Sequence, residues 1–367
     1  MTTVQHVIDV MERLAPRSCA ESWDNVGLMV GNRKTVVKGI LTTLDVTTEA
    51  IEYAVEHNCN LIVSHHPLIF KGLRQVSSDT ALGRMIEMLI TNQIAVYSAH
   101  TNLDIARGGL NDMLAERLGL IDVQGFIKTG EEVLYKVSTF VPEDAADAVR
   151  IAMGAAGAGR IGNYDYCSFS VNGEGRFRGN DQSHPVIGEA GTMTVVPEVQ
   201  INAIVDATNF NAALSAMKEA HPYEEVAYEV VSLVEPNGPT QHLGRIGRLP
   251  NALKLDTFRE WVQEALPDAN IRFCGVVPEK IQSVALCSGA GAEFIKDAAR
   301  HKVDAYVTGD VKYHDAQLAK ELGILVVDAG HFGTESIVAY GLREYLEAAS
   351  LEVPVHAYGE QQDFFFL

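Results

Sequence analysis

The stretch Leu61-Ile62-Val63-Ser64-His65-His66-Pro67 is an apolar run that ends in two adjacent histidines. Two later stretches repeat this design: VYSAHTNLD at residues 96–104 and LVVDAGHFGTE at residues 325–335. Each of them is an apolar, strand-like run followed by a histidine and, four residues later, by a carboxylate. Imidazole and carboxylate are ligands that zinc, iron, manganese and nickel accept. These strand ends therefore predict a metal site built by two related halves of the chain.

The composition is that of an ordinary globular protein. The chain has 367 residues, 47% of them hydrophobic, which is long enough for more than one domain. Its net charge of -19 argues against a protein that binds nucleic acid through phosphate contacts, because such proteins present clustered Lys and Arg. Five scattered cysteines without a CxxC pair favour a reducing compartment. No run approaches the roughly 18 apolar residues of a membrane span, so we expect a cytoplasmic protein without a membrane partner.

Strands and helices alternate at both ends of the chain, and this alternation predicts parallel βαβ units. Near the N-terminus a strand at 40–45, a helix at 49–56 and a strand at 61–64 follow one another. The same order recurs at 284–287, 293–300 and 305–308. Superposing the two copies pairs Glu49 with Glu293, His66 with Asp310, His100 with His331 and Asp104 with Glu335. We therefore expect two related lobes whose strand ends face a shared cleft.

The middle of the chain follows another pattern. Strands at 134–141, 164–171, 199–205 and 226–233 alternate with helices at 143–155 and 211–220, with a Gly-rich stretch after the second strand. This β-α-β-β-α-β order is the split arrangement of ferredoxin-like folds. Glu235-Pro236-Asn237-Gly238-Pro239 is a plausible exit linker. The predicted protein is thus α/β, with an outer domain of two lobes at 1–130 and 236–367 that is interrupted by an inserted α+β domain at 131–235.

The candidate metal-binding residues lie after the strands. Ligands gather beyond the carboxyl ends of parallel strands, and seven residues lie there: His65, His66, His100, Asp104, Asp310, His331 and Glu335. The simplest arrangement gives each of the adjacent histidines its own ion. Two ions about 3.5–4 Å apart are usually bridged by a carboxylate, and Glu335 or Asp104 could fill that position.

Other polar segments are more ambiguous. His100 could bind an ion, orient a ligand or move a proton, and we favour the last two roles. Asp310 could orient a water or form a turn, and His314 is equally a surface residue or a substrate contact. The segment Asp24-Asn25-Val26-Gly27 is typical of a turn. Gly289-Ala290-Gly291 lies between a strand and a helix, where backbone amides can receive a phosphate, but the rest of a dinucleotide-binding fingerprint is missing.

These motifs resemble the Nif-three-like family, whose members are also labelled homologues of type 2 GTP cyclohydrolase I. The resemblance rests on SHHPL at residues 64–68, HTNLD at 100–104, TGD at 308–310 and GHFGTE at 330–335, with DNVGL at 24–28 near the start. The middle of the chain resembles the longer bacterial members through NYDYCSF at 163–169 and HPYEEVA at 221–227. The inserted domain of those members is similar to the PII and CutA folds.

The resemblance implies a dinuclear centre with His65, His66, Asp104, His331 and Glu335 as ligands. It also implies a toroidal homohexamer. We expect two divalent ions per subunit, with zinc first and iron, manganese or nickel as alternatives.

Three functions fit these features. The first is a metal-dependent hydrolase of the cyclohydrolase or phosphoesterase type, acting on a phosphoester or nucleotide-type small molecule, with His100 moving the proton and Asp310 orienting the water. The second is a regulatory or metal-handling binding protein without turnover, in which the inserted domain senses a ligand or gates access. The third is a scaffold for protein partners. We favour the hydrolase, because two divalent ions can activate a water molecule.

Overall fold

The computed structural model describes residues 1–131, 133–162, 164–233 and 240–364. The predicted linker at 235–239, the predicted domain boundary after residue 235 and Asn163 lie outside these described residues. The chain divides into two compact units. One unit combines Met1–Gly130 with Gln241–Leu367, and the other is Glu131–Thr240.

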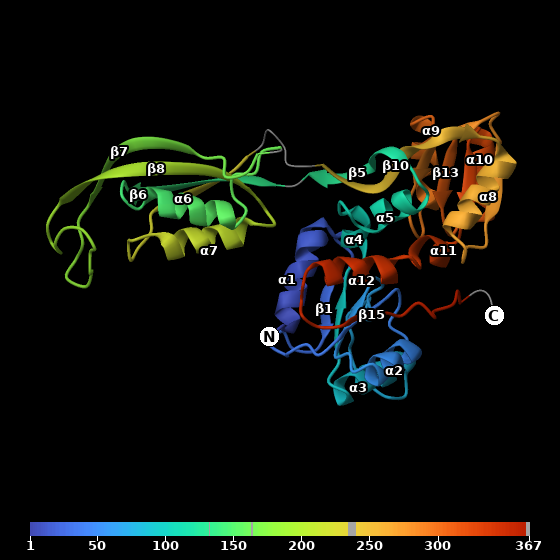
Figure 1. Ribbon diagram of the computed structural model, residues 1–367, viewed down its shortest axis with the longest axis horizontal. Coiled ribbons are helices and arrows are strands. Elements are labelled where there is room, and N and C mark those ends of the chain that lie inside the picture. The colour runs from blue at the N-terminus through green and yellow to red at the C-terminus, as the bar shows by residue number, and fades with distance from the viewer. Residues whose placement is uncertain (132, 163, 234–239, 365–367) are drawn as a thin grey trace. The chain divides into compact units, whose positions relative to one another are not determined.

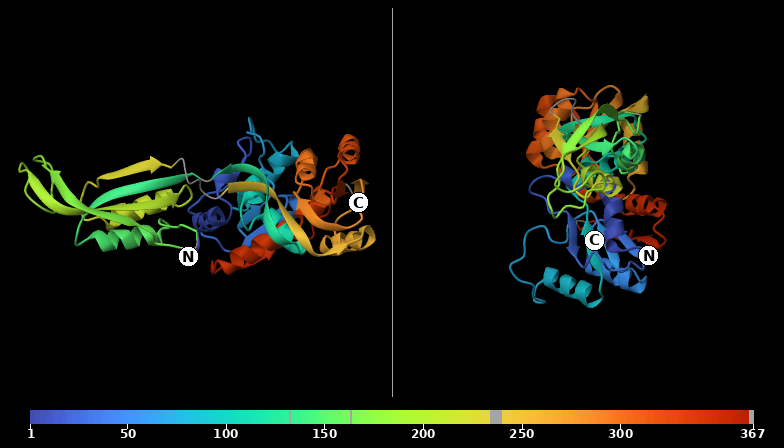
Figure 2. Two further views of the ribbon diagram at one scale, coloured as in Figure 1. Left: turned by 90° about the horizontal axis from the view of Figure 1, so that it is seen from above. Right: turned by 90° about the vertical axis from the view of Figure 1, so that its left-hand side faces the viewer.

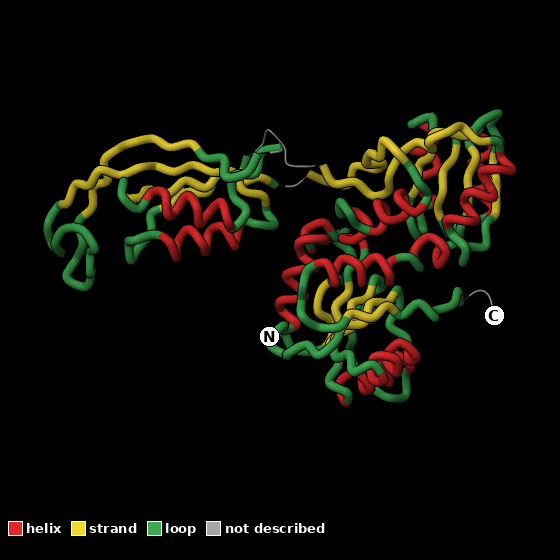
Figure 3. The backbone as a smooth tube through the Cα atoms, in the orientation of Figure 1, coloured by secondary structure: helices red, strands yellow, loops and turns green. Residues whose placement is uncertain are grey.

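The first lobe of the larger unit is a five-stranded sheet with helices on both faces (Figures 1 and 3). Its strand order is β1-β4-β3-β2-β15; β2, β3, β4 and β15 are parallel, and β1 is antiparallel to β4. Because successive side chains on a strand point to opposite faces, Leu61 and Val63 join the core under α1 and α12, whereas Ile62 packs with α2 and α3. The elements are β1 (Gly27–Val30), β2 (Ile40–Thr43), β3 (Leu61–Ser64), β4 (Ala95–Ser98), β15 (Val355–Ala357), α1 (Val4–Leu14), η1 (Arg17–Cys19), α2 (Thr48–Glu56), α3 (Ala81–Thr91), α4 (Thr101–Ile105) and α12 (Val338–Ala348).

The second lobe has a six-stranded sheet in the order β11-β14-β13-β12-β10-β5. Strands β12, β13 and β14 are parallel, β11 and β10 are antiparallel to their neighbours, and β5 and β10 run side by side (Figure 2). Leu286 and Val307 pack with α5 and α8 on one face, and Tyr306 packs with α9 and α10 on the other. The elements are β5 (Ile121–Glu131), β10 (Thr240–Leu253), β11 (Arg272–Gly275), β12 (Ile281–Leu286), β13 (Ala305–Thr308), β14 (Leu325–Asp328), α5 (Leu110–Arg117), α8 (Leu255–Ala265), η2 (Ala292–Phe294), α9 (Ile295–Arg300), α10 (Tyr313–Leu322) and α11 (His331–Glu335).

The two sheets share one strand order. In the first, β4-β3-β2 lie side by side with an antiparallel strand beside β4, and in the second, β14-β13-β12 lie side by side with an antiparallel strand beside β14. The predicted α/β class is therefore confirmed. Register places Thr43 beside Ser64, and Ser64 beside Ser98, so the carboxyl ends of three strands of the first lobe lie level.

The smaller unit is an antiparallel sheet in the order β7-β8-β6-β9, with both helices on one face (Figure 1). Its elements run β6 (Leu134–Pro142), α6 (Ala146–Ala155), β7 (Phe169–Phe177), β8 (Thr194–Asp206), α7 (Phe210–Ala220) and β9 (Tyr228–Ser232), which is the β-α-β-β-α-β order. The strand predicted at 164–171 begins later, at Phe169, because Tyr166 takes a positive φ of 53° that a strand does not allow. No helix among the described residues is long and apolar enough to cross a membrane.

Candidate metal centre

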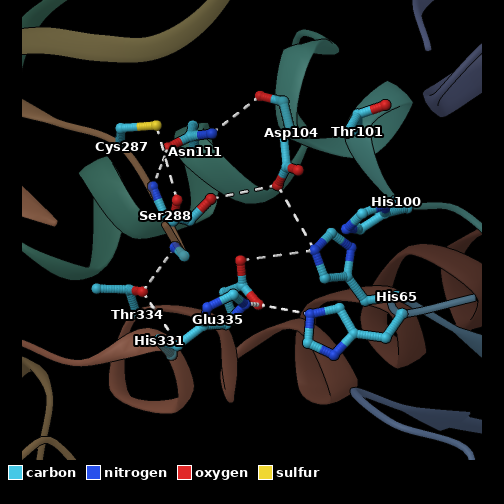
Figure 4. A network of polar contacts seen from close by, with 12 residues as sticks. His65, His100, Thr101, Asp104, Asn111, Cys287, Ser288, His331, Thr334 and Glu335 are labelled. Atoms are coloured by element: carbon cyan, nitrogen blue, oxygen red, sulfur yellow. Dashed lines mark hydrogen bonds and ion pairs between the residues drawn. The ribbon is translucent and has the colours of Figure 1, made fainter. Parts of the chain in front are cut away.

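The predicted ligands come together where parallel strands of the two lobes end. His65 and His66 follow β3, His100 follows β4, and His331 opens the short helix α11 after β14. Helices α4 and α11 then supply Asp104 and Glu335. Figure 4 shows His65, Asp104 and Glu335 pointing toward one another, with His100 and His331 beside them.

Among the described residues, possible metal-binding atoms form three overlapping groups, in each of which all donor atoms lie within 4.8 Å of one another. One group is His65, Asp104 and Glu335, and a second is His66, His331 and Glu335. The third joins His65 and His66 to His100. Glu335 thus belongs to two groups, while His100 belongs to a purely imidazole group.

Glu335 is buried, and its two carboxylate oxygens face different histidines. Its Oε1 lies 3.8 Å from His65 Nε2, and its Oε2 lies 2.9 Å from His66 Nε2 and 3.1 Å from His331 Nε2. Asp104 Oδ1 lies 3.6 Å from His65 Nε2, on the Oε1 side. One carboxylate therefore connects two sets of donors.

Each of the four histidines has its Nδ1 atom held by an oxygen acceptor. The partner of His65 is the carbonyl oxygen of Ala99, at 2.9 Å. The partners of His66, His100 and His331 are the carboxylates of Asp45, Asp24 and Asp310, at 2.8, 2.9 and 2.9 Å. An imidazole whose Nδ1–H donates to an acceptor turns the lone pair of Nε2 outward, which is the usual orientation of a metal-binding histidine. The arrangement aims the Nε2 atoms at the shared space.

Two of these histidines have ring nitrogens that a neutral imidazole cannot satisfy. In His66 both ring nitrogens face carboxylate oxygens, and a neutral imidazole has only one N–H to donate. His65 Nε2 is fully buried, faces two carboxylates, and has no hydrogen-bond partner. A bound proton or a bound metal ion would each satisfy these atoms, so the residues fit a metal ion.

The pKa values of the site without metal also show that the carboxylates favour positive charge on the histidines. Burial lowers the pKa of His66, but hydrogen bonds with Asp45 and Glu335 outweigh it and raise the pKa to about 10. Burial likewise lowers the pKa of His331, and the contacts with Glu335 and Asp310 raise it to about 9. Burial would raise the pKa of Glu335, but three histidines hold it well below its usual range. Burial, aided by the nearby Glu335, raises the pKa of Asp104.

The second lobe shapes the site through backbone as well as side chains. Gly289 follows β12 with a φ of +61°, and a Cβ atom there would lie 2.3 Å from Glu335 Oε1. Its N–H donates to Thr334 Oγ1 at 2.9 Å, and the hydroxyl of Ser288 lies 3.2 Å from Asp104 Oδ1. The sequence predicted Gly289 only as a weak phosphate-binding candidate. In the structure, the absence of a side chain at Gly289 leaves room for the carboxylate of Glu335.

Three further residues take part in the site without having been predicted: Asp24, Asp45 and Gln361. Asp24, predicted as part of a turn, accepts hydrogen bonds from His100 Nδ1 and from the backbone N–H of Thr101. Burial raises the pKa of Asp24, but these bonds lower it to about 2. Asp45, at the end of the predicted strand 40–45, holds His66, and Gln361 donates to Asp45 Oδ2 at 2.5 Å. Asp45 could have been predicted from its place as a polar residue directly after an apolar strand. No sequence feature indicated a role for Gln361.

Asp310 and His314 lie at different distances from the centre. Asp310 takes a positive φ of 56° and its Oδ2 contacts His331 Nδ1, so it holds a candidate ligand. His314 is exposed near the start of α10, where its ring contacts the ring of Tyr313. The structure therefore brings together His65, His66, His100, Asp104, His331 and Glu335, with Asp310 behind His331.

Comparison with known proteins places this site in a family context. The model of the Duf34/NIF3 (NGG1p interacting factor 3) family matches residues 2–363. The GTP cyclohydrolase 1 type 2 homolog of Halalkalibacterium halodurans is 41% identical over 343 residues, covering 94% of this chain and 92% of that protein. Its namesake in Bacillus subtilis is 39% identical over 342 residues, covering 93% and 91%. A solved Bacillus cereus protein related to NIF3 has 40% identity and a TM-score of 0.86, covering 100% of this chain and 99% of that one.

Proposed function

The chain belongs to the Duf34/NIF3 family, and from that premise we propose that it is a dinuclear metal-dependent hydrolase acting on a phosphoester or nucleotide-type substrate. The observation that carries the proposal is the position of Glu335, whose two oxygens face separate sets of histidines. A single carboxylate shared in this way is the usual bridge between two ions. The relatives named GTP cyclohydrolase 1 type 2 homolog favour the same class of substrate.

The donor groups suggest how the ions would be held. His65, Asp104 and Glu335 would hold one ion, and His66, His331 and Glu335 the other. Three protein ligands per ion leave coordination positions open, which is the pattern of catalytic rather than structural sites. Zinc is the first candidate, with iron, manganese or nickel as alternatives, because imidazole and carboxylate suit all four. When bound, the ions would supply Lewis acidity and lower the pKa of a water molecule in the site.

The surrounding residues have separate tasks in this proposal. His100 would move the proton, since its Nδ1 is anchored on Asp24 and its ring lies against those of His65 and His66, with centroids 5.2 and 5.6 Å away. Asp24, with a pKa of about 2, stays ionised and can stabilise the imidazolium form of His100. Asp310 would orient His331 instead of a water molecule, because its carboxylate already contacts the His331 ring.

The first test is a count of metal ions per chain by mass spectrometry, on protein purified without chelators or affinity metals. We expect about two ions per chain, and metal-dependent release of phosphate or ring opening in a screen of phosphoesters and nucleotides. Protein that carries two ions yet turns over none of these compounds would contradict the hydrolase assignment. A content of one ion or none would contradict the dinuclear centre itself.

A binding function without turnover is the second candidate, and one observation favours it. The smaller unit contains its own cavity of about 530 Å³, whose lining includes Phe177, Tyr223 and Arg176. A pocket of this kind could hold the ligand that a sensor domain detects. Small-molecule binding confined to residues 131–240, in protein without turnover, would favour this function over the hydrolase. The predicted homohexamer is a separate proposal, which sedimentation analysis of the native protein would test.

A further inference from the structure

Two large aromatic side chains are exposed next to the candidate metal centre. Trp23 is 58% exposed and Phe70 is 47% exposed. Their ring centroids lie 5.9 Å apart, and each is close to the ring of His100, at 6.2 Å from Trp23 and 6.4 Å from Phe70. The three rings form a triangle, and His100 is the corner that touches the metal-binding histidines.

The local contacts hold this aromatic pair in place. Trp23 directly precedes Asp24, whose carboxylate is fixed by His100 and Thr101. Asn25 Nδ2 donates to the carbonyl oxygen of Ile69 at 2.5 Å, which ties the segment of Trp23 to the backbone next to Phe70. The two aromatic residues therefore come from separate segments that are hydrogen-bonded together.

We propose that Trp23 and Phe70 bind the planar heteroaromatic ring of a phosphorylated substrate and present it to the metal centre. The inference rests on the proposed function and names the substrate class of the same site. Exposed aromatic faces bind flat rings by stacking, a contact that an aliphatic sugar phosphate cannot make. Lys71 and Arg74 are exposed on the loop that carries Phe70, where cations can receive an anionic group.

In this geometry the aromatic pair and the metal-binding residues have separate roles. The ring would lie on Trp23 and Phe70, its edge would reach His100, and the histidines and carboxylates around Glu335 would face the group that reacts. Discrimination between substrates would then come from the aromatic pair, and the reaction would come from the metal-binding residues. Loss of Trp23 should weaken ring binding without loss of metal.

The experiment uses the fluorescence of Trp23. The chain has two tryptophans, and Trp261 donates its indole N–H to the carbonyl of Leu118, away from the predicted ligands. In a Trp261→Phe variant, loaded with metal, Trp23 is the single indole reporter. We expect guanosine 5′-monophosphate to quench its emission in a saturable way, and ribose 5-phosphate, which lacks the ring, to leave it unchanged.

Calorimetry on the otherwise unchanged chain completes the test. Trp23→Ala should bind guanosine 5′-monophosphate at least about fivefold more weakly, whereas Trp23→Phe should retain most of the affinity. Tyr164→Ala is the matched control, because Tyr164 is 75% exposed in the other compact unit. Metal content is measured on every variant and should not change.

Two results would overturn the proposal. One is equal affinity of the wild-type protein for guanosine 5′-monophosphate and ribose 5-phosphate. The other is a Trp23→Ala variant that binds the nucleotide normally. If that variant changes only the oligomeric state, the aromatic pair belongs to a contact between copies of the chain. Protein with two ions but no ring preference would refute the aromatic site alone. Ring-dependent quenching in protein that holds no ions would refute the proposed hydrolase and leave the aromatic site standing.

Discussion

The two lobes place a histidine and a carboxylate at equivalent positions, but the neighbours of these residues differ. Each ends a parallel strand with a histidine and follows it with an acid four residues later, His100 with Asp104 and His331 with Glu335. In the first lobe this histidine is held by Asp24, and the acid lies 3.6 Å from the imidazole of His65. In the second lobe the acid lies among three imidazoles. A shared backbone design thus places donors at equivalent points, and their neighbours decide which one becomes central.

Neutralising Asp104 and Glu335 in turn should have the largest effect on metal content. Glu335→Gln should lose at least one ion per chain, and both sets of donors should weaken, because the glutamate belongs to both. Asp104→Asn should weaken only the set that contains His65, so the second ion should stay. Mass spectrometry of the metal content distinguishes the two variants, and circular dichroism checks that each is folded. Equal losses in both variants would mean that the two lobes contribute alike.

Smaller effects are expected from the residues that anchor the histidines. Asp45 holds His66 and is three-quarters shielded from solvent, whereas Asp310 holds His331 and is 41% exposed. Replacing such an anchor typically lowers metal affinity about 10- to 100-fold. We expect Asp45→Ala to fall near the upper end of that range and Asp310→Ala near the lower end. Competition with a chelator measures both, and a larger loss in Asp310→Ala would reverse the order.

A pH dependence of the metal-free protein is a further expected outcome. The pKa of His66 is raised to about 10 and that of His331 to about 9, against an unfolded value of about 6.5. A raised pKa stabilises the folded state below the unfolded value, and this stabilisation is lost as the pH rises through the folded value. The melting temperature of the metal-free protein should therefore fall between about pH 6.5 and pH 10.

Metal-loaded protein provides the control for that measurement. Bound ions need neutral histidines, so loading should release protons and flatten the pH dependence. A flat melting profile in the metal-free protein would contradict the assignment of protons to His66 and His331. Asp24 and Glu335 have lowered pKa values, so their contribution is present at neutral pH and is lost only as the pH falls through the acidic range.

Part of this site could be predicted from sequence, for a local reason. His65 and His66 directly follow β3, and His331 comes shortly after β14; both strands are short runs that become fully buried. That reasoning needs only neighbouring residues and the periodicity of burial. Glu335 could be identified as a candidate in the same way, but its distances to three histidines depend on the packing of the two lobes.

The remainder depends on contacts that no local pattern encodes. Asp24 lies 76 positions before His100, and Gln361 lies 316 positions after Asp45. The role of Gly289 depends on the 2.3 Å approach of its hypothetical Cβ to Glu335, which the glycine alone does not reveal. The strand predicted at 164–171 begins only at Phe169, after Tyr166, which has a positive φ. The sequence could not predict this start, because a tyrosine does not indicate that backbone conformation.

The pairing of β15 with β2 has a consequence for how the protein is made. Val355 lies beside Ile40, so the outer edge of β2 stays without this partner until β15 has been synthesised. His331 and Glu335 are synthesised after His65 and His66. Until they and β15 have been made, a nascent chain would expose an open sheet edge and an incomplete set of donors. Metal binding by the full set of donors should therefore require synthesis as far as Glu335, and the edge of β2 should stay open until β15 follows.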